Sequence, residues 1–454
     1  MTTLLQRFFN VRREEVAPIL VAAGYFFCVL TALQVLRPAR DAIGMRGGLD
    51  EVRWLFIGTA LATLGVNPMF GWLVSRFNRL VFISATYAFF ALSLVGFYAL
   101  IAVAPAAVGD VSGRVFYVWF SVFNLFSTMV FWALMADRFT PEQSRRLYGA
   151  IAVGGTLGAI FGPWLASVLV KPFGTAAMLL VSAGFLLAAI GAARMVAWLQ
   201  PRPAAGRIEA GAMEAGNRAD AASINRTVIG GNAWAGISAV LRSRYLLGIS
   251  GYVLLMTIIG TFLYLTQLAM VAALGDDTDL RTTTFARINL YTQLTTLLLQ
   301  LVVTGHIMKR FGVAVALALL PLTASLGFIG LAAAGSFAVL ILFQATFTAM
   351  QRAVARPARE TLFTVVSRED KYKSKAVTDT FVYRGGDVIG AWTEAGVRSL
   401  GMALVGLASV AVPLAAVWAV LGLWLGRQQG SMRPADRDSE SANAPARPLT
   451  SPAG

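Results

Sequence analysis

The chain has 454 residues, of which 57% are hydrophobic and only 13% are charged, and its formal net charge at pH 7 is +15. A soluble domain exposes too large a share of its surface to hide that much apolar area, so a soluble globular protein is excluded. Its one Cys (Cys28) and one His (His306) also exclude a disulfide within the chain and a Cys/His zinc site.

The N-terminus predicts a retained membrane helix rather than a cleaved signal peptide. Residues 1–15 carry three arginines, and the apolar run 16–36 that follows is long enough to cross a bilayer. A signal sequence would have a shorter apolar core that ends in small residues at a cleavage site. We therefore expect 16–36 to be the first transmembrane helix.

Apolar stretches of about 20 residues, the length that crosses a bilayer, recur along the whole chain. They predict helices, because an open strand edge in lipid would leave backbone groups without hydrogen bonds. In the eleventh stretch, four charged residues are expected to face a polar interior, because charges that face lipid are costly. The twelve expected spans are 16–36, 52–75, 80–104, 114–136, 147–170, 173–199, 245–272, 285–308, 313–334, 336–355, 376–400 and 402–425.

The basic residues are distributed unevenly between the loops. With twelve spans and the N-terminus inside, the inside segments hold 26 Lys and Arg residues and the outside loops hold eight. Such an excess is typical of cytoplasmic segments, so we expect a multi-pass protein of the cell (inner) membrane with both termini in the cytoplasm. The positive charge then requires no nucleic-acid partner, and the expected partners are the lipid bilayer and a small-molecule substrate.

Composition divides the chain into four segments. Residues 1–199 and 245–426 are each expected to form a bundle of six helices. The stretch 200–244, rich in Ala, Gly, Arg and Asn, is expected to be a partly disordered cytoplasmic connector. Residues 427–454, rich in Ser, Ala, Pro and Arg, are expected to be a disordered cytoplasmic tail.

Three sequence features recur in the same order in the two halves, at similar offsets. A single match would be chance, but three in one order indicate that a six-helix unit was duplicated. The features are a Gly-x-x-x-x-Arg-Phe turn, a polar segment before a helix, and a Gly-Gly pair within that helix. The matching segments are 71–78 with 305–312, 140–146 with 367–373, and 154–155 with 385–386.

The Gly-x-x-x-x-Arg-Phe turn carries a family resemblance. Arg76 and Arg310 are expected at cytoplasmic helix ends, where the helix dipole is negative. The turn resembles the short loop that major facilitator superfamily transporters carry between helices 2 and 3 and again between helices 8 and 9. The resemblance implies an all-α polytopic membrane protein with twelve transmembrane helices in two pseudo-symmetric six-helix bundles. Because Ser75 and Lys309 replace that family's usual Asp, the two arginines are interpreted either as gating residues or as plain helix ends.

A five-residue pattern recurs near two helix ends that we expect to line a central path. Arg37 and Arg40 flank a Pro-Ala pair and precede Asp41, and Arg356 and Arg359 flank the same pair and precede a Glu. Guanidinium groups suit bidentate capture of phosphate or carboxylate. We therefore expect a pair of arginines at each mouth of the path, the alternative being ordinary anchoring at the membrane interface.

A second group of charges lies at and after the polar loop 370–375. Arg384 and Asp387 are about one helical turn apart and could pair. Because they lie within an expected span, both should face a cavity or each other. The loop itself reads alternatively as an ordinary basic cytoplasmic segment. As coupling or gating residues we single out Asp379, Asp387, Glu394, Arg76 and Arg310.

The stretch 356–387 resembles the nucleotide transporter (ATP/ADP translocase) family. In both, an acidic and basic run leads to Lys-Ala-x-x-Asp and then to Arg followed by glycines. Looser similarity covers Arg37 to Asp41, 131–132 and 145–149. The family exchanges nucleotides and holds their phosphates with basic residues. The resemblance therefore implies substrate-binding roles for Arg40, Lys373, Lys375 and Arg384, alongside Arg37, Arg356 and Arg359. Helix 4 departs from the family, because Asn124 is its only candidate for the family's acidic residue.

The leading hypothesis is a monomeric secondary transporter that exchanges an anionic or phosphorylated metabolite, such as a nucleotide, by alternating access. A proton-coupled exporter of small amphiphilic molecules with the same fold is the alternative, and a membrane protein without transport activity is the third. No nucleophile–base set, phosphate-binding loop or metal-ligand spacing is visible, so neither an enzyme nor a bound cofactor or metal is expected.

Overall fold

The structure is a computed structural model that describes residues 12–76, 79–200, 238, 240–303, 307–367, 370, 374–375, 377–401 and 404–432. Every regular element in these residues is a helix, which confirms the predicted all-α fold class. The N-terminal series comprises η1 (Arg13–Glu15), α2 (Val16–Gly44), α3 (Leu49–Arg76), α4 (Arg79–Tyr98), η2 (Ala99–Val103), α5 (Ala106–Arg138) and α6 (Pro141–Leu199). The C-terminal series comprises α10 (Arg244–Ala272), α11 (Thr278–Val303), α12 (Ile307–Ala334), α13 (Phe337–Met350), η3 (Gln351–Ala355), α14 (Arg356–Leu362), η4 (Phe363–Val365), η5 (Thr378–Val382), α16 (Tyr383–Ser399) and α17 (Leu404–Met432).

Eight helices in the described part of the chain are long and apolar enough to cross a membrane by length and composition. The 59-residue α6 is in fact two helices, because Gly174 interrupts it with a left-handed backbone (φ 78°). Only Gly adopts such a φ without steric cost, so the turn between the expected spans 147–170 and 173–199 falls on this residue. The predicted number of twelve crossings stays a prediction.

Two predicted helix ends are wrong, and each was placed where the apolar stretch meets an Arg-Pro-Ala-Arg segment. The first helix was expected to end at residue 36, but α2 continues through Pro38 to Gly44. The tenth was expected to end at 355, but the helix continues as α14, with Pro357 in its first turn. A proline is tolerated in the first turn of a helix. The π-helical turn η3 ends directly before α14, so Pro357 lies in the first turn of a new α-helical segment. Both Arg-Pro-Ala-Arg segments are therefore helical.

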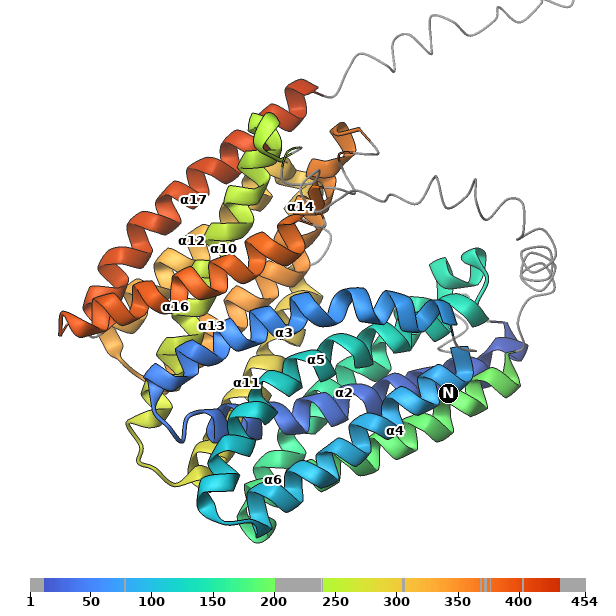
Figure 1. Cartoon of the computed structure of the whole chain (residues 1–454). Helices are drawn as coiled ribbons and strands as arrows, with labels where there is room; N and C mark the ends of the chain where they lie inside the picture. Colours follow the sequence, from blue (N-terminus) through green and yellow to red (C-terminus); the bar gives the residue numbers. More distant parts are fainter. Residues whose placement is uncertain are drawn as a thin grey trace, which may run out of the picture.

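Each half of the chain has its own apolar core. Buried residues between Ile19 and Val196, joined by Ala286, form one core, and those between Tyr245 and Leu425, joined by a few residues of α2, α3 and α5, form the other. Figure 1 shows two helical bundles that meet at lower left and diverge toward the upper right. We call the side where α2 begins and α17 ends the terminal face, and the side of the turn between α2 and α3 the opposite face. The domain boundaries stay a prediction.

The second glycine of each repeated Gly-Gly pair lies against another helix of its half. A Cβ at Gly155 of α6 would clash with the ring of Phe26 in α2, the first long helix of its half. A Cβ at Gly386 of α16 would clash with Thr257 in α10, the corresponding helix of the other half. Small residues let membrane helices approach closely. The equivalent packing supports the internal duplication that the sequence indicates.

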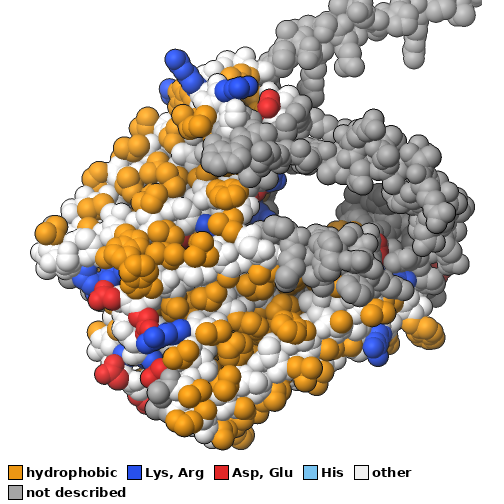
Figure 2. All heavy atoms as spheres, in the orientation of Figure 1, with side chains coloured by type: hydrophobic (Ala, Val, Ile, Leu, Met, Phe, Trp, Pro, Cys, Tyr) orange, Lys and Arg blue, Asp and Glu red, His pale blue; other side chains and the backbone are white. Residues whose placement is uncertain are grey.

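Large apolar side chains cover the flanks of the molecule. Examples are Leu92, Trp198 and Val405, which are 72%, 77% and 69% exposed. Figure 2 shows hydrophobic side chains spread over the visible flank of both bundles, while many of the charged ones gather at its lower left end. A soluble monomer rarely exposes so much contiguous apolar surface, whereas a bilayer solvates it.

Candidate functional site

A central cavity of about 370 Å³ lies between the two bundles. Its walls come from α2, α3 and α5 of the first half and from α10, α11, α13, η3 and α16 of the second. The volume falls in the usual range for small-molecule sites. Its charged lining residues are Arg37, Arg40, Arg352, Arg384 and Asp387.

A second cavity of about 230 Å³ continues from the first. The two share Met256, Gln351, Arg352 and Tyr383 in their walls, so they adjoin each other. The second cavity adds two arginines of α14, Arg356 and Arg359. Arg356 lies twelve residues beyond Gln344 along the polypeptide and therefore nearer the terminal face.

Three of the cavity arginines have no carboxylate partner among the described residues. Arg37 of α2 and Arg356 of α14 lie close enough to Arg352 of η3 to repel its positive charge. Arg352 itself donates a hydrogen bond to Oε1 of Gln293, at 3.4 Å. Like charges held together in a site with low-dielectric walls produce a strong local potential, which attracts anions. These three guanidinium groups therefore give this part of the cavity a positive potential.

The other cavity arginines are neutralised by nearby carboxylates. Arg384 pairs with Asp387 one turn further along α16, at 3.3 Å, and Thr261 of α10 donates a hydrogen bond to the same carboxylate, at 3.3 Å. Arg359 pairs with Asp379 of η5, at 3.6 Å. The predicted pairing of Arg384 with Asp387 is thus present, and both residues line the cavity.

Arg40 belongs to a buried cluster that joins the two halves. It pairs with the neighbouring Asp41 and donates a hydrogen bond to the hydroxyl of Tyr264 in α10, at 3.0 Å. Tyr264 in turn donates to Asp41, at 2.8 Å, and shares a hydrogen bond with Tyr117 of α5, at 3.0 Å. The guanidinium also stacks over the ring of Tyr117, 4.5 Å from its centre. Asp41 is only 2% exposed, so this pair is satisfied within the protein.

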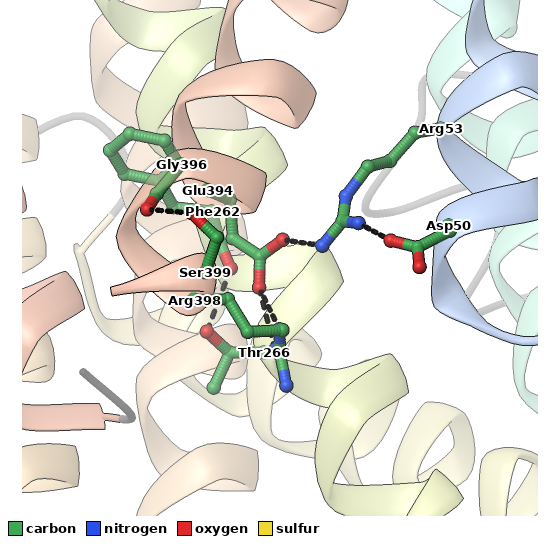
Figure 3. A network of polar contacts seen from close by, with 8 residues as sticks. All are labelled: Asp50, Arg53, Phe262, Thr266, Glu394, Gly396, Arg398 and Ser399. Carbon is green, nitrogen blue, oxygen red and sulfur yellow. Dashed lines mark hydrogen bonds and ion pairs between the residues drawn. The ribbon is translucent and has the colours of Figure 1, made fainter. Parts of the chain in front are cut away.

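A buried ion pair closes the opposite face. Figure 3 shows Arg53 of α3 between Asp50 of its own helix and Glu394 of α16, with Arg398 on the other carboxylate oxygen. The Arg53–Glu394 distance is 2.8 Å, and the two side chains are 6% and 4% exposed. Beside them, Trp54 and Trp392 meet edge to face, with ring centres 5.3 Å apart. We call this group the latch.

A second contact between the halves supports the latch. Asp279 of α11 accepts hydrogen bonds from the backbone N–H and the hydroxyl of Thr175, at 2.8 and 2.6 Å. Thr175 directly follows the break at Gly174, so the carboxylate caps the N-terminus of the second helix of α6. This cap also joins the bundles at the opposite face.

Toward the terminal face, the described hydrogen bonds and ion pairs stay within one half. In the first half, Glu15 accepts from Arg146, at 2.9 Å, and from Gln143, at 3.2 Å. Burial disfavours the charge of Glu15, but hydrogen bonds from Arg12, Arg146 and Gln143 outweigh it and hold its pKa below the usual value. In the second half, Lys375 pairs with Glu360, at 2.6 Å. The bonds between the halves that close one side of the cavity therefore lie at the opposite face, and Figure 1 shows the two bundles diverging toward the terminal face.

The comparisons with known proteins agree with this architecture. The sequence matches the Major Facilitator Superfamily over residues 16–367, which is most of the chain. The chain belongs to the Major Facilitator Superfamily. It is therefore a membrane transporter rather than an enzyme. No curated protein matches its sequence.

Solved structures of superfamily transporters share the fold. A bacterial homologue of the human lysosomal transporter Spinster, in an inward-facing and unoccupied conformation, gives a TM-score of 0.58 at 13% identity, covering 94% of this chain and 100% of that one. The nucleoside transporter NupG (a point mutant) gives a TM-score of 0.54 at 12% sequence identity, covering 92% of this chain and 99% of that one. A POT family transporter in complex with 5-aminolevulinic acid gives a TM-score of 0.59 at 13% sequence identity, covering 91% of this chain and 96% of that one. Identities this low show the fold alone.

The structure of this superfamily member brings some of the predicted site residues together and separates others. Arg37 and Arg40 were expected at one mouth of the path and Arg356 and Arg359 at the other. Arg37 and Arg40 line the central cavity, and Arg356 and Arg359 line the second cavity, nearer the terminal face. The placement of one pair at each mouth of the path stays a prediction. Helix continuation through Pro38 and Pro357 keeps all four residues on helices inside the bundles.

The remaining predicted residues lie elsewhere. Glu394 belongs to the latch at the opposite face, and Lys375 is held by Glu360 outside the cavity lining. Lys373 lies outside the described residues, as do the side chains of Arg76 and Arg310.

Two arginines of the candidate site were not predicted from the sequence. Arg352 lines both cavities, and Arg53 forms the latch. A signal was present for both, because each is the lone charge within an expected apolar span and such a charge usually faces a polar interior. The partner of Arg53 could not be predicted, since Glu394 is 341 residues away in the sequence.

Proposed function

We propose that this protein is a secondary transporter that works by alternating access and carries an anionic or phosphorylated metabolite. The observation that carries the proposal is the group of three arginines, Arg37, Arg352 and Arg356, which lie close together around two adjoining cavities without a carboxylate partner among the described residues. Holding three like charges close together is costly, so an arrangement of this kind is stabilised by an anion that binds between them.

The substrate class is narrowed further by the type of side chain. Arginine presents its donors as a planar fork that matches two oxygens of a phosphate or carboxylate. Together with the resemblance of 356–387 to nucleotide exchangers, this supports a nucleotide as the cargo, moved by ATP/ADP-type exchange. In this antiporter one anion leaves the site on one side of the membrane before another binds there.

The excess of basic residues in the segments at the terminal face supports a cytoplasmic location for that face, and with it an inner-membrane protein with both termini inside. In that orientation the cavity opens to the cytoplasm. The alternate state requires the bundles to separate at the latch and to close at the terminal face.

The test is exchange in proteoliposomes that contain the purified full-length chain. Labelled nucleotides, sugar phosphates and dicarboxylates are offered outside, with the same compound or buffer inside. We expect saturable uptake of at least one phosphorylated compound, faster with internal substrate, and lost in Arg352→Gln. If a broad panel of anions shows no uptake at all, the proposed substrate class is wrong.

A second candidate function is a proton-coupled exporter of small amphiphilic molecules. Asp387 favours it, because a carboxylate in the cavity wall could carry a proton between the two states. The expected behaviour would then be transport driven by a pH gradient and abolished in Asp387→Asn. Exchange of anions that persists in Asp387→Asn without a pH gradient would exclude this alternative.

A further inference from the structure

Toward the opposite face, beside the Arg40 cluster, several uncharged polar side chains line the central cavity. Gln267 of α10, Asn289 and Thr292 of α11, Gln344 of α13 and Thr59 of α3 all contribute to its wall. The two glutamines are linked, since Gln344 donates to Oε1 of Gln267 at 2.7 Å. This amide-lined end differs in chemistry from the arginine-lined end of the same space.

The amide-lined end holds buried polar atoms that have no hydrogen-bond partner among the residues that the structure describes. They are Nε2 of Gln267, Nδ2 of Asn289 and the hydroxyls of Thr292 and Thr59. Gln267, Thr59 and Thr292 are only 5%, 6% and 9% exposed. Leaving a buried donor or acceptor unpaired costs about 1–3 kcal/mol. A ligand that pairs with several of these groups would therefore recover energy that the protein alone loses.

Aromatic rings stand beside these amides. Phe56 of α3 and Tyr264 of α10 line the same cavity and meet edge to face, with ring centres 5.9 Å apart. Phe347 of α13 also contributes to the wall. Side-chain amides that donate and accept in one plane, next to aromatic faces, are the groups that proteins use to hold planar nitrogen heterocycles.

The two ends lie within the reach of one small molecule. Asn289 precedes Gln293 by one helical turn, roughly 6 Å along α11, and Gln293 accepts the hydrogen bond from Arg352. Gln344 precedes Arg352 by eight residues, roughly 12 Å along the helix axis. A ligand whose anionic group and ring are separated by this distance can bind both ends at once.

We propose that the amide-lined end is a second recognition subsite, which binds the planar, uncharged nitrogen heterocycle of an organic anion whose charged group lies at Arg37, Arg352 and Arg356. The inference rests on the proposed function and deepens it. The substrate is then a phosphorylated compound of the nucleotide type, and a bare phosphate or sugar phosphate occupies only half of the site.

The test compares binding of nucleoside monophosphates with binding of ribose 5-phosphate, which has the anionic group and the sugar but no heterocycle. Equilibrium binding is measured on the purified full-length protein and on the variants Asn289→Leu, Thr292→Val and Arg352→Gln. Thr266→Val is the matched control, since Thr266 is a buried threonine of α10 whose hydroxyl bonds the backbone of Phe262 and does not line the central cavity.

We expect the wild type to bind its best nucleoside monophosphate about tenfold or more tightly than ribose 5-phosphate. The reason is that ribose 5-phosphate lacks the heterocycle and leaves the buried amides and hydroxyls of the site without hydrogen-bond partners. Asn289→Leu and Thr292→Val should remove most of this preference and leave binding of ribose 5-phosphate unchanged, whereas Thr266→Val should change neither. Arg352→Gln should weaken both ligands. The melting temperature of each unliganded variant controls for folding.

Three results would overturn the inference. Equal binding of the two ligand types by the wild type is one, and an unchanged preference in the α11 variants is another. An equal loss of both ligands in those variants is the third, because it would indicate a structural effect. In each case binding of ribose 5-phosphate would leave the proposed function standing. If no anion binds at all, the proposed function fails and this inference fails with it.

Discussion

Arg53 and Glu394 lie 341 positions apart in the sequence and form a buried ion pair of 2.8 Å between the two bundles. Removing one partner of such a pair destabilises the state that contains it, because the other charge then keeps only a more exposed partner, Asp50 for Arg53 and Arg398 for Glu394. In the proposed alternating-access cycle the pair breaks when the bundles separate at the opposite face. It would then act on the balance between the two transport states as well as on stability.

The first prediction follows from this pair. Glu394→Gln should shift the protein toward the state open at the opposite face by on the order of a hundredfold, since a broken buried pair costs about 3 kcal/mol or more. Spin labels at Val108→Cys and Leu400→Cys, in a Cys28→Ser background, report the separation of the bundles there. Both positions are exposed, at 43% and 71%. A distance distribution identical to that of the unmodified latch would contradict this role.

Arg352 should dominate anion recognition, and Lys375 should contribute little. Arg352→Gln is expected to raise the KM for exchange about tenfold or more, and Arg352→Lys less, because lysine keeps the charge but loses the planar fork. Lys375→Gln should change KM by less than about threefold, since Lys375 is occupied by Glu360. Arg287→Gln, at an exposed position of α11, is the control. A larger effect at Lys375 than at Arg352 would move the anion site toward the terminal face.

The surroundings of Gly154 and Gly184 predict that the same substitution, Gly to Ala, changes the melting temperature differently at the two positions. Gly154→Ala should lower the melting temperature markedly, because the added methyl group meets the backbone of Ala23, which cannot move aside as a flexible side chain can. Gly184→Ala should be neutral or slightly stabilising, because nothing lies within 4 Å of the added carbon. Thermal unfolding in detergent compares them. Equal effects would show that α2 and α6 do not pack in this way.

Glu15 makes the stability of the first half depend on pH. Its pKa is lowered in the folded protein by hydrogen bonds from Arg12, Arg146 and Gln143, so the ionised form stabilises the fold. That stabilisation is complete above the unfolded pKa, near 4.5, and is lost as the pH falls through the lower folded value. The melting temperature of Glu15→Gln should therefore lie below that of the wild type at pH 7 and approach it in acid. A constant difference across this range would assign the effect to packing instead.

The sequence alone predicted the fold class well, because long apolar stretches admit few structures in lipid. It predicted two helix ends poorly, because the expected spans stopped where the apolar run meets an Arg-Pro-Ala-Arg segment. Pro38 and Pro357 both lie within helices that continue past these ends, and the π-helical turn η3 precedes Pro357. The four arginines of these segments therefore lie on helices, with one pair in the wall of each of the two cavities.

The site was partly predictable for a different reason. Arg37, Arg40, Arg356 and Arg384 were found because their local patterns repeat or pair within a helical turn. Ion pairs between residues that are far apart in the sequence leave no such local pattern. The contact of Lys375 with Glu360 depends on how the chain turns after α14, and that of Arg53 with Glu394 depends on how the bundles pack.

The account's central claim is that an anion binds between the unpaired arginines of the central cavity. A cryo-electron microscopy map of the full-length protein with its transported phosphorylated compound tests this most directly. We predict ligand density in contact with Arg37, Arg352 and Arg356. Density held instead at Lys375 or elsewhere on the terminal face, with the three arginines free, would contradict the account.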